Sequence, residues 1–240
     1  MLTWSILPGS DNALSTEAIM SVRTASDNLV RNYLFLRRAI GFLGIGLPLV
    51  LIFGKPVVDG GGLLNSISGY YYSGMRDVWV GVMCAIGVFL LSYRGYGRID
   101  DIAGNIAAVA AVGVALFPTT PSNGDRTDVL IGYLHLGFAA VFFLTLAFFC
   151  IVLFTKSDNE IPGSRKPERN RLYVTSGVIM LVCLALIVVC GLVFDDATKS
   201  LYPALWLESV AIFAFGVAWL TKGGTLLPDR TVATEPAVTA

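Results

Sequence analysis

The stretch NSISGYYYSGMRDVWVGVMCAIGVFLLSYRGY, residues Asn65 to Tyr96, decides the fold of this chain. It begins with serines and tyrosines, reaches the charged pair Arg76 and Asp77, continues as an apolar run, and ends near a second arginine, Arg94. Polar and aromatic residues at both ends of an apolar segment are typical of a chain that crosses a bilayer. This stretch therefore predicts a transmembrane helix with a polar, aromatic entrance.

The composition extends this prediction to the whole chain. Of its 240 residues, 55% are hydrophobic and only 14% are charged, whereas about 25% are charged in an average soluble domain. A water-soluble fold of this length could not bury so much apolar surface. The apolar runs are continuous rather than alternating, which favours helices over a β-barrel. The sequence predicts an all-α, polytopic transmembrane bundle that forms one domain.

Six apolar segments are predicted to be spans. They lie at about 39–53, 77–93, 102–117, 129–155, 172–194 and 203–221, so that the transmembrane domain covers 39–221. Residues 1–38 are predicted to be a cytoplasmic segment without a cleaved signal peptide. Apolar residues recur at helical spacing from Ser15 to Leu36, which indicates an interfacial amphipathic helix or, alternatively, a mobile tail. Residues 222–240 are predicted to be a disordered cytoplasmic tail.

The distribution of positive charge predicts the orientation. With six spans both termini lie on the same side, and thirteen of the 17 lysines and arginines fall on that side. Only Lys55, Arg76, Arg126 and Lys199 fall on the other. Because cytoplasmic loops are enriched in lysine and arginine, both termini are predicted to be cytoplasmic. We expect an integral protein of a bacterial inner (plasma) membrane.

The few polar residues of the outer half form the candidate site. Its members are Ser68, Tyr70, Arg76, Asp77, His135 and Glu208. The first four precede or begin the second span. At 1.5 Å per residue, His135 lies roughly 9 Å into the fourth span and Glu208 roughly 7 to 8 Å into the sixth.

Glu208 is the most informative of these residues. An ionised carboxylate facing lipid costs several kcal/mol, so Glu208 is expected to face the bundle and to pair with Arg76 or His135. It would then contact a ligand, carry a proton or act as a base. The alternative is a structural ion pair between the sixth and second spans. The other members have comparable structural alternatives, as an interface histidine, a surface charge pair and an aromatic belt.

No metal site or cofactor is predicted. The four cysteines lie inside apolar runs and form no Cys-x-x-Cys pair, which favours buried thiols. The single histidine, His135, excludes a zinc site made of several histidines. The basic segment at 165–171 is too short to predict nucleic-acid binding, and is interpreted as a topology determinant that could also contact anionic lipid.

Several segments resemble known membrane proteins. Ile67–Ser68 before the second span, the alanine- and glycine-rich third span and His135 in the fourth resemble the Frag1/DRAM/Sfk1-like six-span membrane proteins. The segments SISGYYYSGMRD (66–77), VALFPTTP (114–121) and FAFGVAWLTKG (213–223) resemble signatures of an uncharacterised bacterial integral membrane family. This resemblance implies a role in membrane organisation or lipid handling. Ser68 and Asp77 also align with residues of ceramidase-like metal hydrolases, but one histidine cannot supply the zinc ligands.

Three functions remain open from the sequence. The leading hypothesis is a non-enzymatic protein whose outward-facing polar pocket binds a membrane lipid or small amphiphile, with Arg76 pairing to an anionic group. The alternatives are a small proton-coupled transporter that uses Glu208 and His135, and a membrane enzyme that acts on a lipid headgroup with Asp77 or Glu208 as base. The oligomeric state is not predicted, because the glycines of the first span could pack against a partner chain or a neighbouring span.

Overall fold

The computed structural model describes residues 10–95, 97–156, 164–193 and 201–229. Every regular element in these ranges is helical, which confirms the predicted all-α class. The helices are α1 (Ser10–Val58), the 3₁₀-helix η1 (Ser68–Tyr72), α2 (Arg76–Ser92), α3 (Arg98–Leu116), α4 (Arg126–Phe148) with its final π-helical turn η2 (Phe149–Leu153), α5 (Lys166–Val193) and α7 (Pro203–Lys222).

Five helices are long and apolar enough to cross a membrane. The candidate spans are Met20–Val58, Arg98–Leu116, Arg126–Leu153, Lys166–Leu192 and Pro203–Lys222. Each overlaps one of the spans predicted from the sequence. The predicted second span corresponds to α2, whose 17 residues are at the short limit of about 17 to 25 residues for a membrane-crossing helix.

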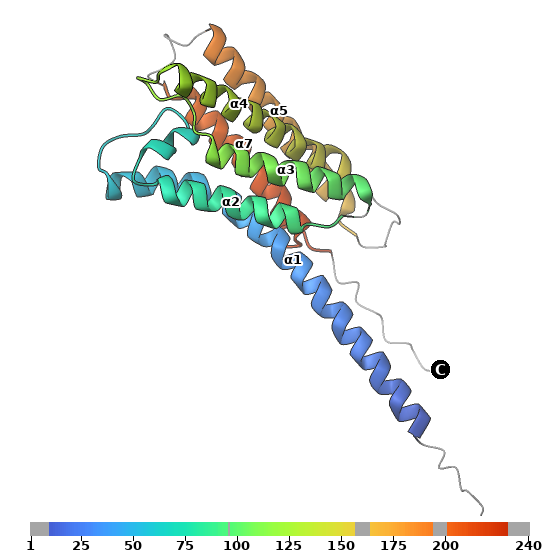
Figure 1. The fold of residues 1–240 in the computed structure, drawn as a ribbon. Helices are drawn as coiled ribbons and strands as arrows, with labels where there is room; N and C mark the ends of the chain where they lie inside the picture. The colour runs from blue at the N-terminus through green and yellow to red at the C-terminus, as the bar shows by residue number, and fades with distance from the viewer. Residues whose placement is uncertain (1–9, 96, 157–163, 194–200, 230–240) are drawn as a thin grey trace, which may run out of the picture.

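The six long helices form a ring (Figure 1). Each packs mainly against two neighbours, in the order α1, α2, α3, α4, α5, α7 and back to α1. Helices that follow one another in the chain are therefore neighbours in space, as short connections between antiparallel helices require. The ring has two ends, which we name the Glu208 end, where α2, α4 and α7 begin, and the Arg94 end, where α3 and α5 begin.

Small residues allow the helices of the ring to approach closely. On α7, a Cβ added to Gly216 would lie 2.9 Å from the carbonyl oxygen of Gly41 and 3.0 Å from the backbone nitrogen of Ile45, both on α1. Helix α3 buries alanines against its neighbours: Ala103, Ala107, Ala108, Ala110, Ala111 and Ala115. At Gly41 and Gly44 the glycines of the first span face a helix of the same chain, while the space beside Gly46 is open.

Helix α1 is one continuous helix of 49 residues. The sequence predicts an amphipathic helix, over Ser15 to Leu36, that leads into the first span, and the structure has no break between the two. Arg38 donates from Nε to the carbonyl oxygen of Gly223 at 2.8 Å, which ties α1 to the end of α7. The part of α1 before this contact extends beyond the ring (Figure 1).

The loop after α1 folds back over the Glu208 end. Its Ile67 and Tyr70 are buried, and the backbone N–H of Leu205 on α7 donates to the carbonyl oxygen of Asn65 at 2.9 Å. The Tyr72 hydroxyl donates to the carbonyl oxygen of Thr119 at 2.7 Å, which connects η1 to the α3–α4 connection. These contacts place η1 at the mouth of the ring.

Residues 223–229 are held against the start of α5. Arg169 donates from Nη1 to the carbonyl oxygen of Leu227 at 3.1 Å and to Oδ1 of Asp229 at 2.7 Å. The predicted disordered tail begins at residue 222, and these contacts lie within its first part. Residues 230–240 lie outside the described residues.

An aromatic cluster fills the ring interior toward the Arg94 end. The rings of Tyr93 and Trp219 have centroids 5.2 Å apart, and Trp219 also lies 5.2 Å from Phe154 and 5.8 Å from Phe149. All four side chains are at most 1% exposed. Edge-to-face and tilted packing of this kind leaves little free space, so the interior is solid on this side.

Candidate functional site

A cavity of about 380 Å³ occupies the ring interior toward the Glu208 end. All six long helices and η1 contribute to its wall, and most of the wall is apolar. The lining residues on which the site depends are Ser68, Trp79, Met83, His135, Leu136, Ala139, Phe142, Phe143, Val188, Glu208 and Phe215. Its volume falls in the range of about 300 to 1,000 Å³ that is usual for small-molecule sites.

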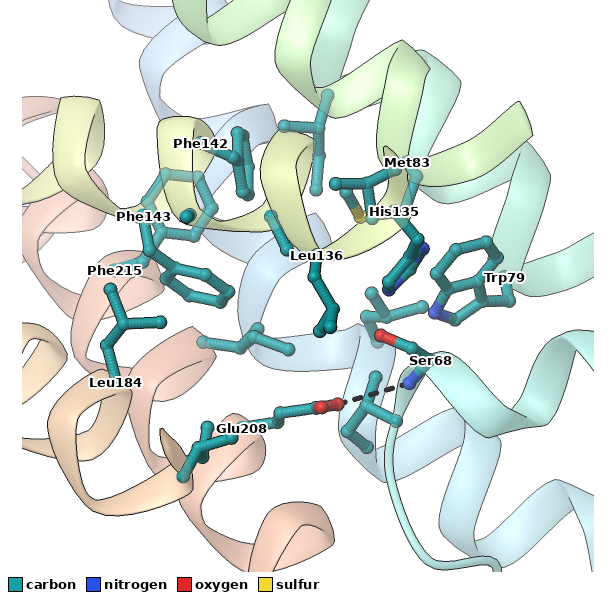
Figure 2. Close-up of a pocket in the computed structure, with 18 of the residues that line it drawn as sticks. Ser68, Trp79, Met83, His135, Leu136, Phe142, Phe143, Leu184, Glu208 and Phe215 are labelled. Carbon is teal, nitrogen blue, oxygen red and sulfur yellow. Dashed lines mark hydrogen bonds between the residues drawn. The ribbon is translucent and has the colours of Figure 1, made fainter. Parts of the chain in front are cut away.

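Polar groups gather at one side of this cavity. Figure 2 shows Ser68, Trp79, His135 and the carboxylate of Glu208 around one part of the space, with Phe142, Phe143 and Phe215 around the other. Such a division between a polar and an apolar part matches an amphiphilic occupant in shape and chemistry.

Glu208 is positioned by helix α7 and by the folded-back loop. It lies five residues after Pro203, the first residue of α7. Its Oε2 accepts a hydrogen bond from the backbone N–H of Ser68 at 3.1 Å, the dashed line in Figure 2. A carboxylate that accepts from one main-chain amide keeps further acceptor sites on its oxygens. Glu208 can therefore hold the loop and still accept from a bound molecule.

Ser68 belongs to the same polar group. As the first residue of η1, it offers its N–H to Glu208, and its hydroxyl lies on the cavity side in Figure 2. No hydrogen-bond partner of this hydroxyl is found among the described residues. A serine hydroxyl both donates and accepts, so it can serve either kind of polar group on a ligand.

His135 and Trp79 complete the polar side. Nδ1 of His135 lies 2.7 Å from the carbonyl oxygen of Phe117, and a carbonyl can only accept, so Nδ1 carries the proton. In the neutral imidazole the other nitrogen, Nε2, is then an acceptor. The His135 ring stacks on Trp79 with centroids 6.3 Å apart, and both side chains are at most 3% exposed. The ring is held by both contacts and has little freedom to rotate.

Between α4 and α5 the wall of the cavity includes exposed side chains. Leu136 on α4 and Val188 on α5 both line the cavity, yet they are 58% and 52% exposed. In a membrane span the outside of the ring faces lipid. A molecule in the cavity is therefore separated from the lipid by single side chains.

Three of the predicted site residues lie outside the cavity. Arg76 donates from Nη2 to the Tyr71 hydroxyl at 2.6 Å, and its guanidinium carbon lies 4.3 Å from the centroid of the same ring. Asp77 is exposed in the first turn of α2. Tyr70 is fully buried within the loop packing, and burial raises the pKa of its phenol.

The prediction that Glu208 pairs with Arg76 or His135 was wrong. Neither Arg76 nor His135 forms the predicted pair, since Arg76 stacks on its neighbour in the same segment and His135 contacts the end of α3. The main-chain N–H of Ser68 takes that position instead. Of the six predicted residues, the structure brings together Ser68, His135 and Glu208.

Sequence reasoning missed the aromatic and apolar wall. Trp79, Phe142 and Phe215 lie inside apolar runs, where a residue that faces the cavity looks the same as one that faces lipid. Only Trp79 carried a signal, because it is a tryptophan within one turn of the charged pair at the start of its span.

The site offers hydrogen bonding without a metal cluster. Among the described residues no group of three or more histidine, cysteine, aspartate or glutamate side chains could hold a metal ion.

Comparison of the chain with protein-family models, curated proteins and solved structures found no match.

Proposed function

We propose that this chain is a membrane protein that binds a single-chain lipid or small amphiphile in the cavity at the Glu208 end. The observation that supports this most directly is the apolar cavity with Ser68, His135 and Glu208 on one side. In such a site the apolar wall holds the hydrocarbon chain, and the polar side chains orient the head. The lipid handling implied by the family resemblance agrees with this proposal.

The polar residues favour an uncharged head with hydroxyl or amide groups. No lysine or arginine is among the residues that line the cavity. An anionic head would therefore lie beside the Glu208 carboxyl group without a compensating charge, at a cost of several kcal/mol. A hydroxyl head can donate to Glu208 or to Nε2 of His135 and can accept from Ser68. The sequence predicted a ligand with an anionic head that pairs with Arg76. Because Arg76 lies outside the cavity, we propose a ligand with an uncharged head instead.

The surroundings favour binding over passage through the ring. The aromatic cluster around Trp219 fills the ring interior between the cavity and the Arg94 end, so the cavity ends inside the protein. The exposed wall at Leu136 and Val188 supports lateral entry from lipid between α4 and α5. A cavity of about 380 Å³ is near the lower limit for ligand sites, which favours one acyl chain over two.

We also propose six spans with both termini on the cytoplasmic side of a bacterial plasma membrane. Helix α2 packs along α1 and α3 within the ring, which supports its crossing the membrane with them. The Arg94 end carries most of the lysines and arginines of the described residues, and the positive-inside rule favours its placement in the cytoplasm.

The first prediction concerns filling the cavity. Ala139→Phe places a ring in the space that the ligand would occupy, so the purified protein is expected to lose both a copurified lipid and binding of added 1-monooleoylglycerol. Native mass spectrometry in detergent gives the mass of the adduct and its occupancy. Wild-type protein is expected to bind 1-monooleoylglycerol more tightly than oleate, because oleate carries an anionic head.

Two variants make this experiment decisive. Glu208→Gln keeps an acceptor for Ser68 but removes the carboxylate. Its affinity for 1-monooleoylglycerol is expected to fall by about fivefold to tenfold, a loss near 1 kcal/mol in binding free energy. Asp77→Asn removes a carboxylate outside the cavity and should bind as wild type. Binding to Ala139→Phe at the wild-type level, or equal loss in Asp77→Asn, would refute the proposal.

A further inference from the structure

A second hollow lies at the opposite end of the molecule, between the projecting part of α1 and the α2–α3 turn. It has a volume of about 330 Å³ and is lined by Val30, Tyr33, Leu34, Arg37, Arg94 and Gly95. Two of its six lining residues are arginines, Arg37 on α1 and Arg94 in the α2–α3 connection. This separates it from the cavity at the Glu208 end, which has no basic lining residue.

Both arginines are held in place by the protein. The guanidinium carbon of Arg37 lies 5.6 Å from the centroid of Tyr93, a ring that is 1% exposed and packs on Trp219. Arg94 donates from Nη1 to the carbonyl oxygens of Leu91 and Tyr93 at 3.1 and 3.2 Å, at the C-terminal end of α2. These contacts position the two cations without neutralising their charge.

Neither arginine has an acidic partner within the described part of the chain. The ion pairs found there join Lys156 to Asp100, Arg165 to Glu168 and Arg169 to Asp229. Nε of Arg37 is buried and has no hydrogen-bond partner among the described residues.

Two carboxylates at the start of α3, Asp100 and Asp101, lie against Gly95. Asp100 faces Lys156 at 3.6 Å, and Oδ1 of Asp101 accepts from the backbone N–H of Gly95 at 3.3 Å. Neither carboxylate is among the residues that line the hollow, whose charged lining residues are both arginines.

The surroundings place this hollow where apolar surface gives way to charge. Val88 and Leu91 on α2 are 58% and 51% exposed, and lie just before Arg94 in the chain. On α1, Arg37 and Arg38 lie about one turn before Phe42, which is 59% exposed. Such a boundary is the level at which lipid headgroups lie beside a membrane protein.

We infer that Arg37 and Arg94 form a binding site for the phosphate group of an anionic phospholipid from the leaflet at the Arg94 end. Two guanidinium groups, one from α1 and one from the α2–α3 connection, present several N–H donors, which suits the oxygens of a phosphate diester. Val88 and Leu91 would lie beside the acyl chains. The inference does not depend on the proposed function, because it concerns a different hollow with opposite chemistry.

The test compares two double variants of the full-length protein in detergent. Arg37→Gln/Arg94→Gln removes both cations of the hollow, whereas Arg31→Gln/Arg98→Gln removes the same charge from the same end without altering the lining. Native mass spectrometry measures binding of phosphatidylglycerol and of phosphatidylcholine with identical chains. Wild-type protein is expected to bind phosphatidylglycerol more tightly than phosphatidylcholine. The affinity of the first double variant for phosphatidylglycerol is expected to fall about tenfold, as for loss of a charge-assisted hydrogen bond of about 1.5 kcal/mol.

The control variant should retain phosphatidylglycerol within about twofold of wild type, since exposed charges contribute little to affinity. Equal losses in both double variants would show diffuse attraction and overturn the inference, as would equal wild-type binding of the two lipids. Displacement of phosphatidylglycerol by millimolar inorganic phosphate would assign the hollow to free phosphate instead of lipid. Should Arg37→Gln/Arg94→Gln unfold, exposed Arg94→Gln alone is expected to show a partial loss, and wild-type affinity there would contradict the site.

Discussion

At the scale of single residues, Glu208 joins the two parts of the molecule that enclose the cavity. Its helix supplies the side chain, and the loop after α1 supplies the N–H of Ser68 that it accepts at 3.1 Å. Loss of this hydrogen bond would leave a main-chain donor unpaired beside an apolar cavity, which costs about 1 to 3 kcal/mol. The residue therefore stabilises the loop over the cavity even when no ligand is bound.

A second buried carboxylate, Asp100, lies at the Arg94 end. It is 1% exposed, and its Oδ2 lies 3.6 Å from Nζ of Lys156, whose side chain is 43% exposed. We predict that Lys156→Met destabilises the protein by about 1 to 2 kcal/mol, because the buried carboxylate loses one of the cations near it. The exposure of Lys156 and the nearby charge of Lys222 both limit this loss.

A double-mutant cycle checks this prediction by thermal unfolding in detergent. In the background of Asp100→Asn the same Lys156→Met change is expected to cost almost nothing, because the buried charge is already absent. Equal costs in both backgrounds would mean that the pair does not contribute to stability.

At the scale of elements, the contact between α1 and α7 depends on glycine. Backbone atoms of Gly41 and Ile45 lie within about 3 Å of the position that a Cβ on Gly216 would take. We predict that Gly216→Val separates the two helices and lowers the stability by about 2 kcal/mol, since overpacking against a backbone cannot be relieved by a rotamer change. The midpoint of thermal unfolding in detergent measures this effect.

Gly46→Val is the matched control for this change. It lies on α1, and a Cβ added there meets nothing within 4 Å. The control is expected to change the midpoint only slightly, because valine and glycine have similar helix propensity to within a few tenths of a kcal/mol. If the midpoint of thermal unfolding fell by a similar amount in both variants, the cause would be helix propensity and not packing between α1 and α7.

At the scale of the whole molecule, the ring order makes the crossing of α2 testable. If α2 spans the membrane, the residues at its two ends lie on opposite sides. In a background with the four native cysteines replaced by alanine, Asp77→Cys is expected to react with a membrane-impermeant maleimide in intact cells. Arg98→Cys is expected to react only after permeabilisation.

Labelling of both positions from the same side would contradict the six-span arrangement and leave α2 as a helix that does not cross. Reaction of Arg98→Cys alone in intact cells would keep the crossing but reverse the proposed orientation.

The sequence by itself determined the class and the approximate limits of the helices. Apolar runs must become helices in lipid, because each backbone group has to form its hydrogen bond within its own segment. The predicted spans at 102–117 and 203–221 accordingly match α3 (Arg98–Leu116) and α7 (Pro203–Lys222) closely. Burial of polar residues also follows from the cost of exposing them to lipid, which is why Glu208 and His135 were identified as candidates.

The tertiary structure decided which residues meet. Hydrophobic periodicity does not distinguish a face that lines a cavity from one that faces lipid, so the apolar wall around Phe142 and Phe215 had no signal. The partner of Glu208 is a main-chain N–H, which every residue except proline carries, and only the fold-back of η1 brings that of Ser68 into reach. Contacts between spans depend on the order of packing around the ring, and the local pattern of each span contains no information about that order.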